Sequence, residues 1–582
     1  MTVPMVSVLS GNSSSDTDSL GVTLVLNLRE NISEVVLAVA SSSVSLSRQL
    51  LRFQPGQGHN NVSLSALLTA HHADWRAGLN RTLQAFPSFF ASVHPNASDF
   101  EGLGGYSWSK GVFNATRARQ LGYRTNWDLS GTWMAYQGLF LGYTPSWLNL
   151  GPVAEGIDQY NVTPATIAAA YQLAKAGGFR SLSYFNLADW GVNIELDSGG
   201  RPSSGRSVRS GHLNLPAAGP LRNASCGTRP GGQVAPCPSP EGSLDYLLDE
   251  LSLAILQNGW SPLRGAFQHY IPDWVKCVVL DAGDEKLAAL QIEQLQLHFD
   301  LLGDAFEGIV VDRLDFSDYY NQDYDDGVSW VPRSDGRPGY AAGRALRLAY
   351  RQMFDRLGRL LHGGGAQQGG TPRLLLINCN ALCRVDLFEG ADGTFSEGSH
   401  LNGVAWAGLA APSILWTYSL TGSTALQLDA FFQKHLLMDT YPMAPMPKND
   451  HSITPGNATI DAAYAAYAPL FNTMVGARWL LLPQPAAVTS AAGQTSPQWN
   501  VFHREAPQDV LVVLVLSSSP SQQVGVQLSL EAGAFLPGNM SSMRAAMLRP
   551  SDAGAWIPLT VRDGLVQATL DRGAAIVRFY SQ

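Results

Sequence analysis

The sequence predicts an α/β protein: a (β/α)8 TIM barrel flanked by N-terminal and C-terminal antiparallel β-sandwich domains. Short β-prone bursts punctuated by Ser, Asn and Gly fill residues 17–67 and return from about residue 495. Between these regions strands and helices alternate, and several strands end in polar or aromatic residues. That alternation favours a barrel over a doubly wound sheet, in which a G-x-G-x-x-G would be expected after a strand.

The predicted domain boundaries follow these changes in sequence pattern. A chain of 582 residues is longer than one typical domain. We expect a sandwich over residues 1–100, a barrel over 101–490 with an insert near 195–240, and a second sandwich over 491–582. Residues 86–107 have the pattern of a linker, and the glycines within it neither follow a strand nor open a helix. A phosphate-binding loop is therefore disfavoured there.

Strands and helices of the barrel are expected from apolar runs, capping residues and stop signals. The expected strands lie at residues 122–128, 181–190, 276–283, 309–312, 374–379 and 414–418, with a short strand inside 385–397. The expected helices lie at residues 163–175, 243–257, 284–302, 341–361 and 425–437.

Composition and charge exclude several classes of protein. The net charge of −9 and the lack of basic runs argue against a nucleic-acid partner. No apolar run approaches the roughly 18–20 residues that a membrane span needs. The sequence has no H-E-x-x-H and no paired C-x-x-C, and its histidines (among them His269, His400, His435 and His451) are scattered. A metal site is disfavoured, and no cofactor is expected.

Sequons and cysteines favour a secreted or lumenal, N-glycosylated protein, although no complete signal peptide is visible. The sequons lie at Asn12, Asn31, Asn61, Asn80, Asn96, Asn114, Asn161, Asn223, Asn457 and Asn539. Cys226 and Cys237 flank a Gly/Pro-rich insert that a disulfide could close. Cys277, Cys379 and Cys383 lie in or beside apolar strands and are expected to be buried thiols, with a Cys379–Cys383 bridge as the alternative. With five cysteines, at least one thiol stays free.

Asp312 is the first candidate for chemistry. The apolar run at residues 309–311 ends abruptly in Asp312-Arg313-Leu314-Asp315, and charges at the end of a buried strand are costly unless paired or used. If Val310 points into the barrel, strand alternation points Asp312 inward and Arg313 outward. A structural ion pair of Asp312, with Arg124 or Arg313, is the alternative. Asp315 lies beyond the strand, where it would line the site or cap a turn.

A barrel that hydrolyses sugars needs two carboxyl groups from different strand ends. The candidates are Asp128, Asp189, Asp281, Asp312, Asp315 and Glu397. From spacing alone, Glu397 is an ordinary loop carboxylate, and Asp392 before Gly393 serves the turn.

Short motifs over residues 120–485 carry a family resemblance. EGIVVDRLDF resembles the D-G-[apolar]-x-x-D strand of (β/α)8 glycoside hydrolases related to α-galactosidases, dextranases and endo-α-N-acetylgalactosaminidases, although Glu307 stands where many have Asp. ADGTFSE resembles a D-G-[IT]-F-x-E segment of uncharacterised glycoside hydrolase-like barrels, which share elements similar to YFN at 184–186, KCVVLDAG at 276–283 and NDHSI at 449–453. The resemblance implies Asp312 as nucleophile and Glu397 as general acid/base.

A substrate-binding set is expected around these two carboxyl groups, since aromatic and polar side chains suit a half-wet sugar cleft. Its members are Asp315, Arg313, Trp127, Asp128, Asn186, Trp190, Asp281, Asn378, Asp450 and His451. The structural alternatives are that the tryptophans pack the core and that Asp450 and His451 fix a proline-rich loop.

The predicted function is a retaining glycoside hydrolase-like enzyme acting on an oligosaccharide, polysaccharide or glycan. The alternatives are a non-catalytic carbohydrate-binding or cell-wall protein on the same fold, and a structural matrix glycoprotein. A carboxyl separation of about 5–5.5 Å would fit retention, and about 6.5–9.5 Å would fit inversion. Sugar, linkage and exo or endo action are not specified by the sequence.

Overall fold

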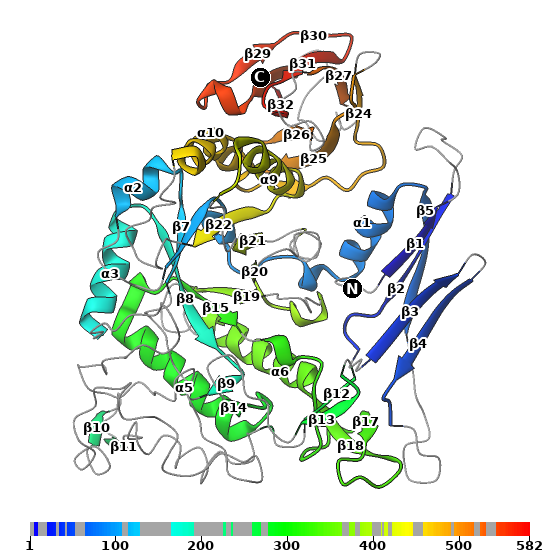
Figure 1. The fold of residues 1–582 in the computed structure, drawn as a ribbon, viewed down its shortest axis with the longest axis vertical. Coiled ribbons are helices and arrows are strands. Elements are labelled where there is room, and N and C mark those ends of the chain that lie inside the picture. The colour runs from blue at the N-terminus through cyan, green and yellow to red at the C-terminus, as the bar shows by residue number, and fades with distance from the viewer. Residues whose placement is uncertain are drawn as a thin grey trace.

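A parallel sheet of eight strands forms the centre of the protein (Figure 1). The structure, a computed structural model, describes residues 5–9, 20–30, 34–40, 43–52, 65–107, 114–128, 164–190, 225–228, 234–236, 256, 259–262, 264–268, 278–312, 314–363, 372–378, 385–397, 409, 413–416, 422–445, 458–490, 494–516, 524–530 and 543–581.

The central strands pair in the order β15-β19-β20-β21-β22-β6-β7-β8, and β8 pairs again with β15, which closes the barrel. All eight pairings are parallel. The strands are β6 (Gly104–Ser107), β7 (Thr125–Asp128), β8 (Arg180–Asn186), β15 (Gly308–Asp312), β19 (Leu374–Asn378), β20 (Gly393–Glu397), β21 (Ser413–Trp416) and β22 (Tyr441–Pro445). The carboxyl ends of all eight strands therefore lie at one edge of the ring.

Helices follow most of these strands along the chain and lie around the outside of the ring (Figure 1). They are α2 (Ala115–Gln120), α3 (Pro164–Ala176), α5 (Glu285–Leu302), α6 (Leu346–Gly358), α9 (Ala425–Met438) and α10 (Ala458–Met474). Side-chain caps start three of them. Asn114 accepts a hydrogen bond from the Arg117 backbone N–H at 2.9 Å, Asp284 accepts one from the Leu287 backbone N–H at 2.9 Å, and Thr424 forms a capping box with Gln427.

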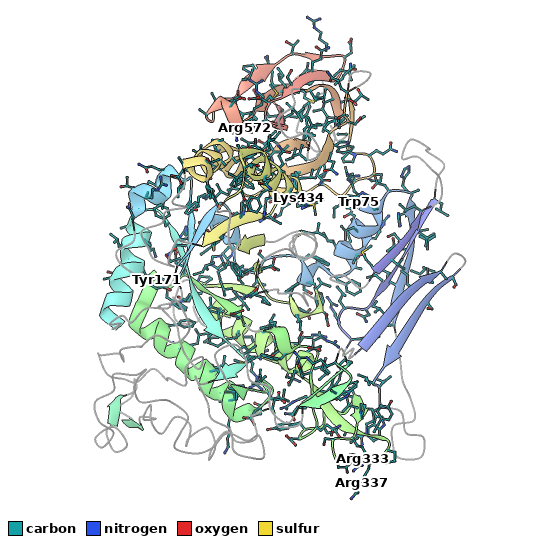
Figure 2. The ribbon with its side chains drawn as sticks, viewed as in Figure 1. Trp75, Tyr171, Arg333, Arg337, Lys434 and Arg572 are labelled. Carbon is teal, nitrogen blue, oxygen red and sulfur yellow. The ribbon has the colours of Figure 1, made fainter. Side chains whose placement is uncertain are left out.

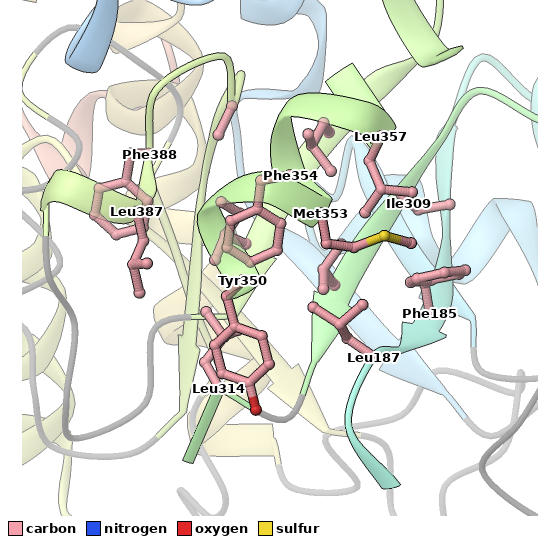
Figure 3. Close-up of a cluster of buried hydrophobic side chains, with 14 of the residues drawn as sticks. Phe185, Leu187, Ile309, Leu314, Tyr350, Met353, Phe354, Leu357, Leu387 and Phe388 are labelled. Carbon is pink, nitrogen blue, oxygen red and sulfur yellow. The ribbon is translucent and has the colours of Figure 1, made fainter. Parts of the chain in front are cut away.

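The outward faces of the strands pack on these helices. Ile309 and Val311 of β15 are fully buried in a cluster that contains Met353 and Leu357 of α6, together with Phe185 of β8 (Figure 3). Because side chains alternate along a strand, Val310 and Asp312 point to the opposite face, into the ring.

Antiparallel sheets lie on both sides of the barrel along the chain. The N-terminal sheet has the order β1-β2-β5 and packs on α1, while β3 and β4 form a separate hairpin. These elements are β1 (Met5–Leu9), β2 (Leu20–Leu26), β3 (Glu34–Ala40), β4 (Ser43–Gln49), β5 (Ala66–His72) and α1 (Trp75–Ala85). Thr23 Oγ1 of β2 and His71 Nε2 of β5 share a hydrogen bond of 2.7 Å on the face of the sheet that α1 covers.

The C-terminal region contains a six-stranded and a four-stranded antiparallel sheet that share a buried apolar core. The larger sheet contains, in order, β23 (Arg478–Trp479), β25 (Gln498–Arg504), β26 (Asp509–Val515), β32 (Ala574–Ser581), β28 (Met543–Leu548) and β29 (Ile557–Leu559). The smaller contains β24 (Ala486–Ser490), β27 (Val524–Leu530), β31 (Leu565–Leu570) and β30 (Val561–Arg562). Arg572 joins this region to α9 through an ion pair with Asp429 at 2.6 Å, and Figure 2 shows it beside that helix.

Another antiparallel sheet, here called the insert sheet, is built from two segments that follow neighbouring barrel strands. Its order is β13-β12-β16-β18-β17. β12 (Gly259–Ser261) and β13 (Ala266–Gln268) come after β8, whereas β16 (Tyr320–Asn321), β17 (Ser329–Pro332) and β18 (Tyr340–Ala345) come after β15. Figure 2 shows Arg333 and Arg337 at the far end of the β17–β18 hairpin.

The N-terminal and C-terminal regions contact each other through α1. The Arg76 guanidinium lies over the rings of Trp75 and Trp499, at 4.6 and 4.9 Å from their centroids. Asp74 accepts a hydrogen bond from the Gln484 backbone N–H at 3.1 Å. Residues about 400 positions apart in the chain are thus joined directly.

The structure corrects three local expectations. The predicted linker ends in β6, the first barrel strand, where Gly104 packs so closely that an added Cβ would lie 2.8 Å from the Met443 side chain. The apolar run at residues 276–283 is not a barrel strand, because β14 (Val278–Val279) pairs antiparallel with β9 (Asp189–Trp190). The helix expected from residue 341 starts at Leu346, after β18.

Candidate active site

The carboxyl edge of the barrel gathers five of the predicted polar residues. Asp128, Asn186, Asp312, Asn378 and Glu397 are each the last residue of their strand. β8, β15, β19 and β20 are consecutive neighbours in the ring, so Asn186, Asp312, Asn378 and Glu397 end four adjacent strands. Glu397 is two strands away from Asp312, with Asn378 on the strand between them.

Asp312 is held by Asn378 across the β15–β19 pair. The Asn378 Nδ2 group donates to Asp312 Oδ1 at 2.6 Å. Asn378 is 1 % exposed, while Asp312 is half-buried and keeps access to solvent. A hydrogen bond to a carboxylate fixes its direction, so Asp312 is an oriented carboxyl group at the inner edge of the ring.

In the strand register, Glu397 is offset from Asp312 toward the carboxyl end. Asn378 pairs with Phe395, and Glu397 lies two residues beyond Phe395, paired with Trp416 of β21. The strands of such a barrel are tilted, so that residues at one height are shifted by about one residue from each strand to the next. An offset of two residues over two strands therefore puts the two candidate carboxyl residues in the same layer of the ring.

Several predicted residues fall partly or wholly outside the part of the chain that the structure describes. For Glu397, Trp127, Asp128, Asn186, Trp190 and Asp315 only the backbone is described, and Arg313, Asp450 and His451 lie outside the described ranges. By backbone register, Asn186 pairs with Asp312, Trp127 pairs with Tyr106, and Trp190 pairs with Val278. Asp315 lies in the short 3-10 helix Leu314–Phe316.

Asp281 lies in the loop after β14, where it joins the insert sheet to α5, and no described contact brings it to Asp312. It is fully buried, and its Oδ2 accepts hydrogen bonds from Arg344 Nη2 at 2.6 Å and Asn321 Nδ2 at 2.9 Å. Burial raises the pKa of Asp281, and the Arg344 guanidinium opposes that rise. Its described contacts are those of a structural ion pair, and its predicted role in substrate binding stays a prediction.

Two other carboxylates of the recognised motifs serve the opposite edge of the barrel. Glu307 accepts from Arg180 Nη1 at 2.6 Å and from the Ser181 backbone N–H at 2.9 Å. Asp392 accepts four hydrogen bonds, from the backbone N–H groups of Val93, His94 and Leu375 and from His362 Nε2. Both carboxylates have structural partners, and those of Asp392 lie in the segment before the barrel, in β19 and after α6, whereas the sequence predicted a role in its own turn.

Asp318 is a polar residue near the site that the sequence analysis did not single out. It follows Asp312 by six positions and accepts a hydrogen bond from Ser261 Oγ at 2.6 Å. Burial raises the pKa of Asp318, and the nearby Arg264 charge lowers it. Its position after a strand end was visible in the sequence, but its partner on β12 was not.

No metal or membrane element is found among the described residues. Within those ranges, no three His, Cys, Asp or Glu side chains are arranged to hold a metal ion. His435 is buried on α9, its Nδ1 lies 3.0 Å from Thr440 Oγ1, and burial lowers its pKa to about 3. None of the helices in the described ranges is long and apolar enough to span a bilayer.

A cavity of about 270 Å³ lies beside α6, between the insert sheet and the Val385–Leu387 turn. Its charged lining residues are Asp326, Arg344, Arg351, Asp355, Asp386 and Glu389. None of the strand-end residues lines it, so it is separate from the candidate site.

Comparison with known proteins supports the fold. No family model matches the chain. No curated protein matches its sequence. Among solved structures, the cycloalternan-degrading enzyme from Trueperella pyogenes aligns over 99% of this chain and 73% of its own, with 10% identity and a TM-score of 0.52. A cycloisomaltooligosaccharide glucanotransferase from Paenibacillus sp. aligns over 99% and 98%, with 8% identity and a TM-score of 0.49. The likeness is one of fold: the chain has a fold similar to that of the cycloalternan-degrading enzyme.

Proposed function

We propose that the protein is a (β/α)8 glycoside hydrolase that cleaves O-glycosidic bonds with retention of configuration. The observation that carries the proposal is the placement of two acidic residues, Asp312 and Glu397, at the ends of β15 and β20 on one edge of a parallel ring. Active sites of such barrels lie at this edge. The two strands are separated by one neighbour, β19, whose last residue Asn378 contacts Asp312.

Asp312 is the proposed nucleophile. It is oriented by Asn378 and remains accessible, so that one carboxylate oxygen can attack the anomeric carbon while the other keeps its hydrogen bond. The attack forms a glycosyl ester and breaks the bond to the leaving oxygen.

Glu397 is the proposed general acid/base. It would give its proton to the leaving oxygen in the first step and take a proton from water in the second, in which water releases the sugar from Asp312. Strands lie about 4.8 Å apart, so the backbones of the two residues are about 10 Å apart around the ring. The retaining mechanism requires the two carboxyl groups to lie about 5–5.5 Å apart.

The test is a panel of 4-nitrophenyl α- and β-glycosides with the wild type, Asp312→Asn and Glu397→Gln. We expect turnover of at least one glycoside, its loss by about a thousandfold or more in Asp312→Asn, and rescue of Glu397→Gln by azide as a glycosyl azide. Asp304→Asn is the matched control, because Asp304 is exposed and lies before β15, at the opposite edge of the barrel. Its activity should equal that of the wild type.

The outcome also separates the alternatives. A product of inverted configuration, measured by NMR of the first-formed sugar, would overturn the retaining mechanism. Saccharide binding without turnover, unchanged in Asp312→Asn, would identify a non-catalytic carbohydrate-binding protein.

A further inference from the structure

The insert sheet rises from the edge of the barrel that carries the candidate site. Its two segments follow β8 and β15, whose last residues, Asn186 and Asp312, are paired in register. β12 of the first segment pairs with β16 of the second through Trp260 and Tyr320. The sheet therefore forms a wall that begins beside Asp312.

This wall is held rigidly. Asp281 ties Asn321 of β16 to Arg344 of β18, and Arg344 also lies over the Tyr324 ring at 3.7 Å from its centroid. Asp326 accepts hydrogen bonds from the backbone N–H groups of Val328, Ser329 and Ala345. A rigid wall can hold a binding group in a fixed position, which lowers the entropic cost of binding.

Residues 316–320 lead from the end of β15 into the insert sheet. Asp318 is the accessible residue of this otherwise buried run. Phe316, Ser317, Tyr319 and Tyr320 are all buried, whereas Asp318 is half-buried. Its carboxylate is oriented by the fully buried Ser261 of β12, at 2.6 Å. The carboxyl group is partly removed from water, and this burial raises the pKa of Asp318.

Arg264 supplies a positive charge next to this carboxylate. It is exposed in the turn between β12 and β13, and its guanidinium lies 5.9 Å from the centroid of the Tyr319 ring. The charge of Arg264 lowers the pKa of Asp318, yet the described side chains form no ion pair with each other. The Asp318 carboxylate, which accepts hydrogen bonds, and the Arg264 guanidinium, which donates them, are thus close together without forming an ion pair.

Such a pair matches vicinal sugar hydroxyls, each of which can donate to a carboxylate and accept from a guanidinium. We propose that Asp318 and Arg264 form a second sugar subsite, so that the substrate is an oligosaccharide with at least two sugar residues bound to the protein. This inference rests on the proposed function, because it assigns the first subsite to Asp312 and Glu397.

The test compares two chromogenic probes that differ only in chain length: the 4-nitrophenyl glycoside of one sugar and that of the matching trisaccharide. The variants are Asp318→Asn, Arg264→Gln and Ser261→Ala. Asp335→Asn is the control, since Asp335 is an exposed carboxylate of the same sheet that pairs with Arg333. Thermal unfolding of each variant checks that the fold is kept, and Arg264→Gln changes only an exposed turn.

We expect KM for the trisaccharide probe to rise about tenfold or more in Asp318→Asn and Arg264→Gln, as expected for lost hydrogen bonds to charged groups. Ser261→Ala should give a smaller rise, and Asp335→Asn none. KM for the monosaccharide probe should stay within about twofold of the wild type in every variant. Equal effects on both probes, or no effect on either, would overturn the subsite.

The design keeps the two proposals separate. If Asp312→Asn abolishes turnover and Asp318→Asn leaves it unchanged on both probes, the subsite is refuted. The proposed role of Asp312 then still stands. If the wild type cleaves neither probe, calorimetry with the free trisaccharide decides: binding weakened about tenfold in Asp318→Asn supports the subsite without catalysis. Undiminished or undetectable binding refutes it.

Discussion

Asn378 donates a hydrogen bond to Asp312 across two neighbouring barrel strands, at 2.6 Å. The contact gives one side chain at the carboxyl edge a fixed orientation, and it makes Asn378 a positioning residue for the proposed nucleophile. Substituting Asn378 therefore removes the orientation of the Asp312 side chain and leaves its carboxylate in place.

Asn378→Ala should lower kcat by about tenfold to a hundredfold, because a hydrogen bond to a charged group is worth about 1.5–3 kcal/mol. KM should change little, since the carboxylate itself remains. Steady-state kinetics on the cleaved 4-nitrophenyl glycoside measure both constants. Asn80→Ala on α1 is the control, and wild-type kcat in Asn378→Ala would show that the contact is only structural.

Arg344→Met should destabilise the protein by about 3–5 kcal/mol, because it leaves the buried Asp281 carboxyl without its cation. The pKa of Asp281, already raised by burial, should rise further, so the variant should lose more stability at pH 7 than near pH 4. Urea unfolding at both pH values measures this. Arg356→Met is the control: it removes an exposed ion pair between α6 and Glu285 of α5 and should cost less than about 1 kcal/mol.

Asp439 should make the protein less stable as the pH rises. Its pKa lies well above the usual value, mainly through burial and then through the Glu101 carboxylate. The folded state thus holds a proton that the unfolded chain has released. The stability from the protonated form is fully present below the unfolded pKa, about 3.9, and is lost as the pH rises through the raised folded pKa.

Asp439→Asn should therefore reduce the fall in unfolding free energy between pH 5 and pH 8. Asn suits the left-handed backbone of this residue, whose φ is 52°. Asp563→Asn is a matched control, because Asp563 has a φ of 50° and is exposed. Identical pH profiles for the wild type and Asp439→Asn would contradict the prediction.

Asp392→Ala should release the segment before the barrel. The carboxylate accepts from two backbone N–H groups of that segment, from one of β19 and from His362, so its loss leaves several buried donors unpaired. We expect a loss of at least about 3 kcal/mol. Limited proteolysis should then cut near residues 92–96, and Asp355→Ala, which removes an exposed carboxylate, should not change the digest.

Sequence patterns located the barrel strands that are rich in branched apolar residues, such as β15 and β19. They missed β6, whose sequence GGYS has no such residues and whose Gly104 packs too closely on β7 and β22 for a side chain. They also took KCVVLDAG for a barrel strand, because a short apolar run does not reveal whether its partner is parallel.

The same limit applies to the candidate site. Alternation correctly predicted that Asp312 points away from the outer helices, because a period of two residues is a local property. The contacts of Asp318 with Ser261 and of Asp281 with Arg344 join residues 57 and 63 positions apart, and no local pattern encodes them. The pairing of Asp312 with Glu397 stays a prediction.

The contact between α1 and the C-terminal sheets has a consequence for synthesis of the chain. Arg76 and its partner Asn500 are 424 positions apart, so at roughly 5–20 residues per second the helix emerges about 20–85 s before its partner exists. During that interval the faces of Trp75 and Arg76 that later meet Trp479 and Trp499 are uncovered. A nascent chain stalled before residue 478 therefore leaves this surface of α1 exposed to other chains.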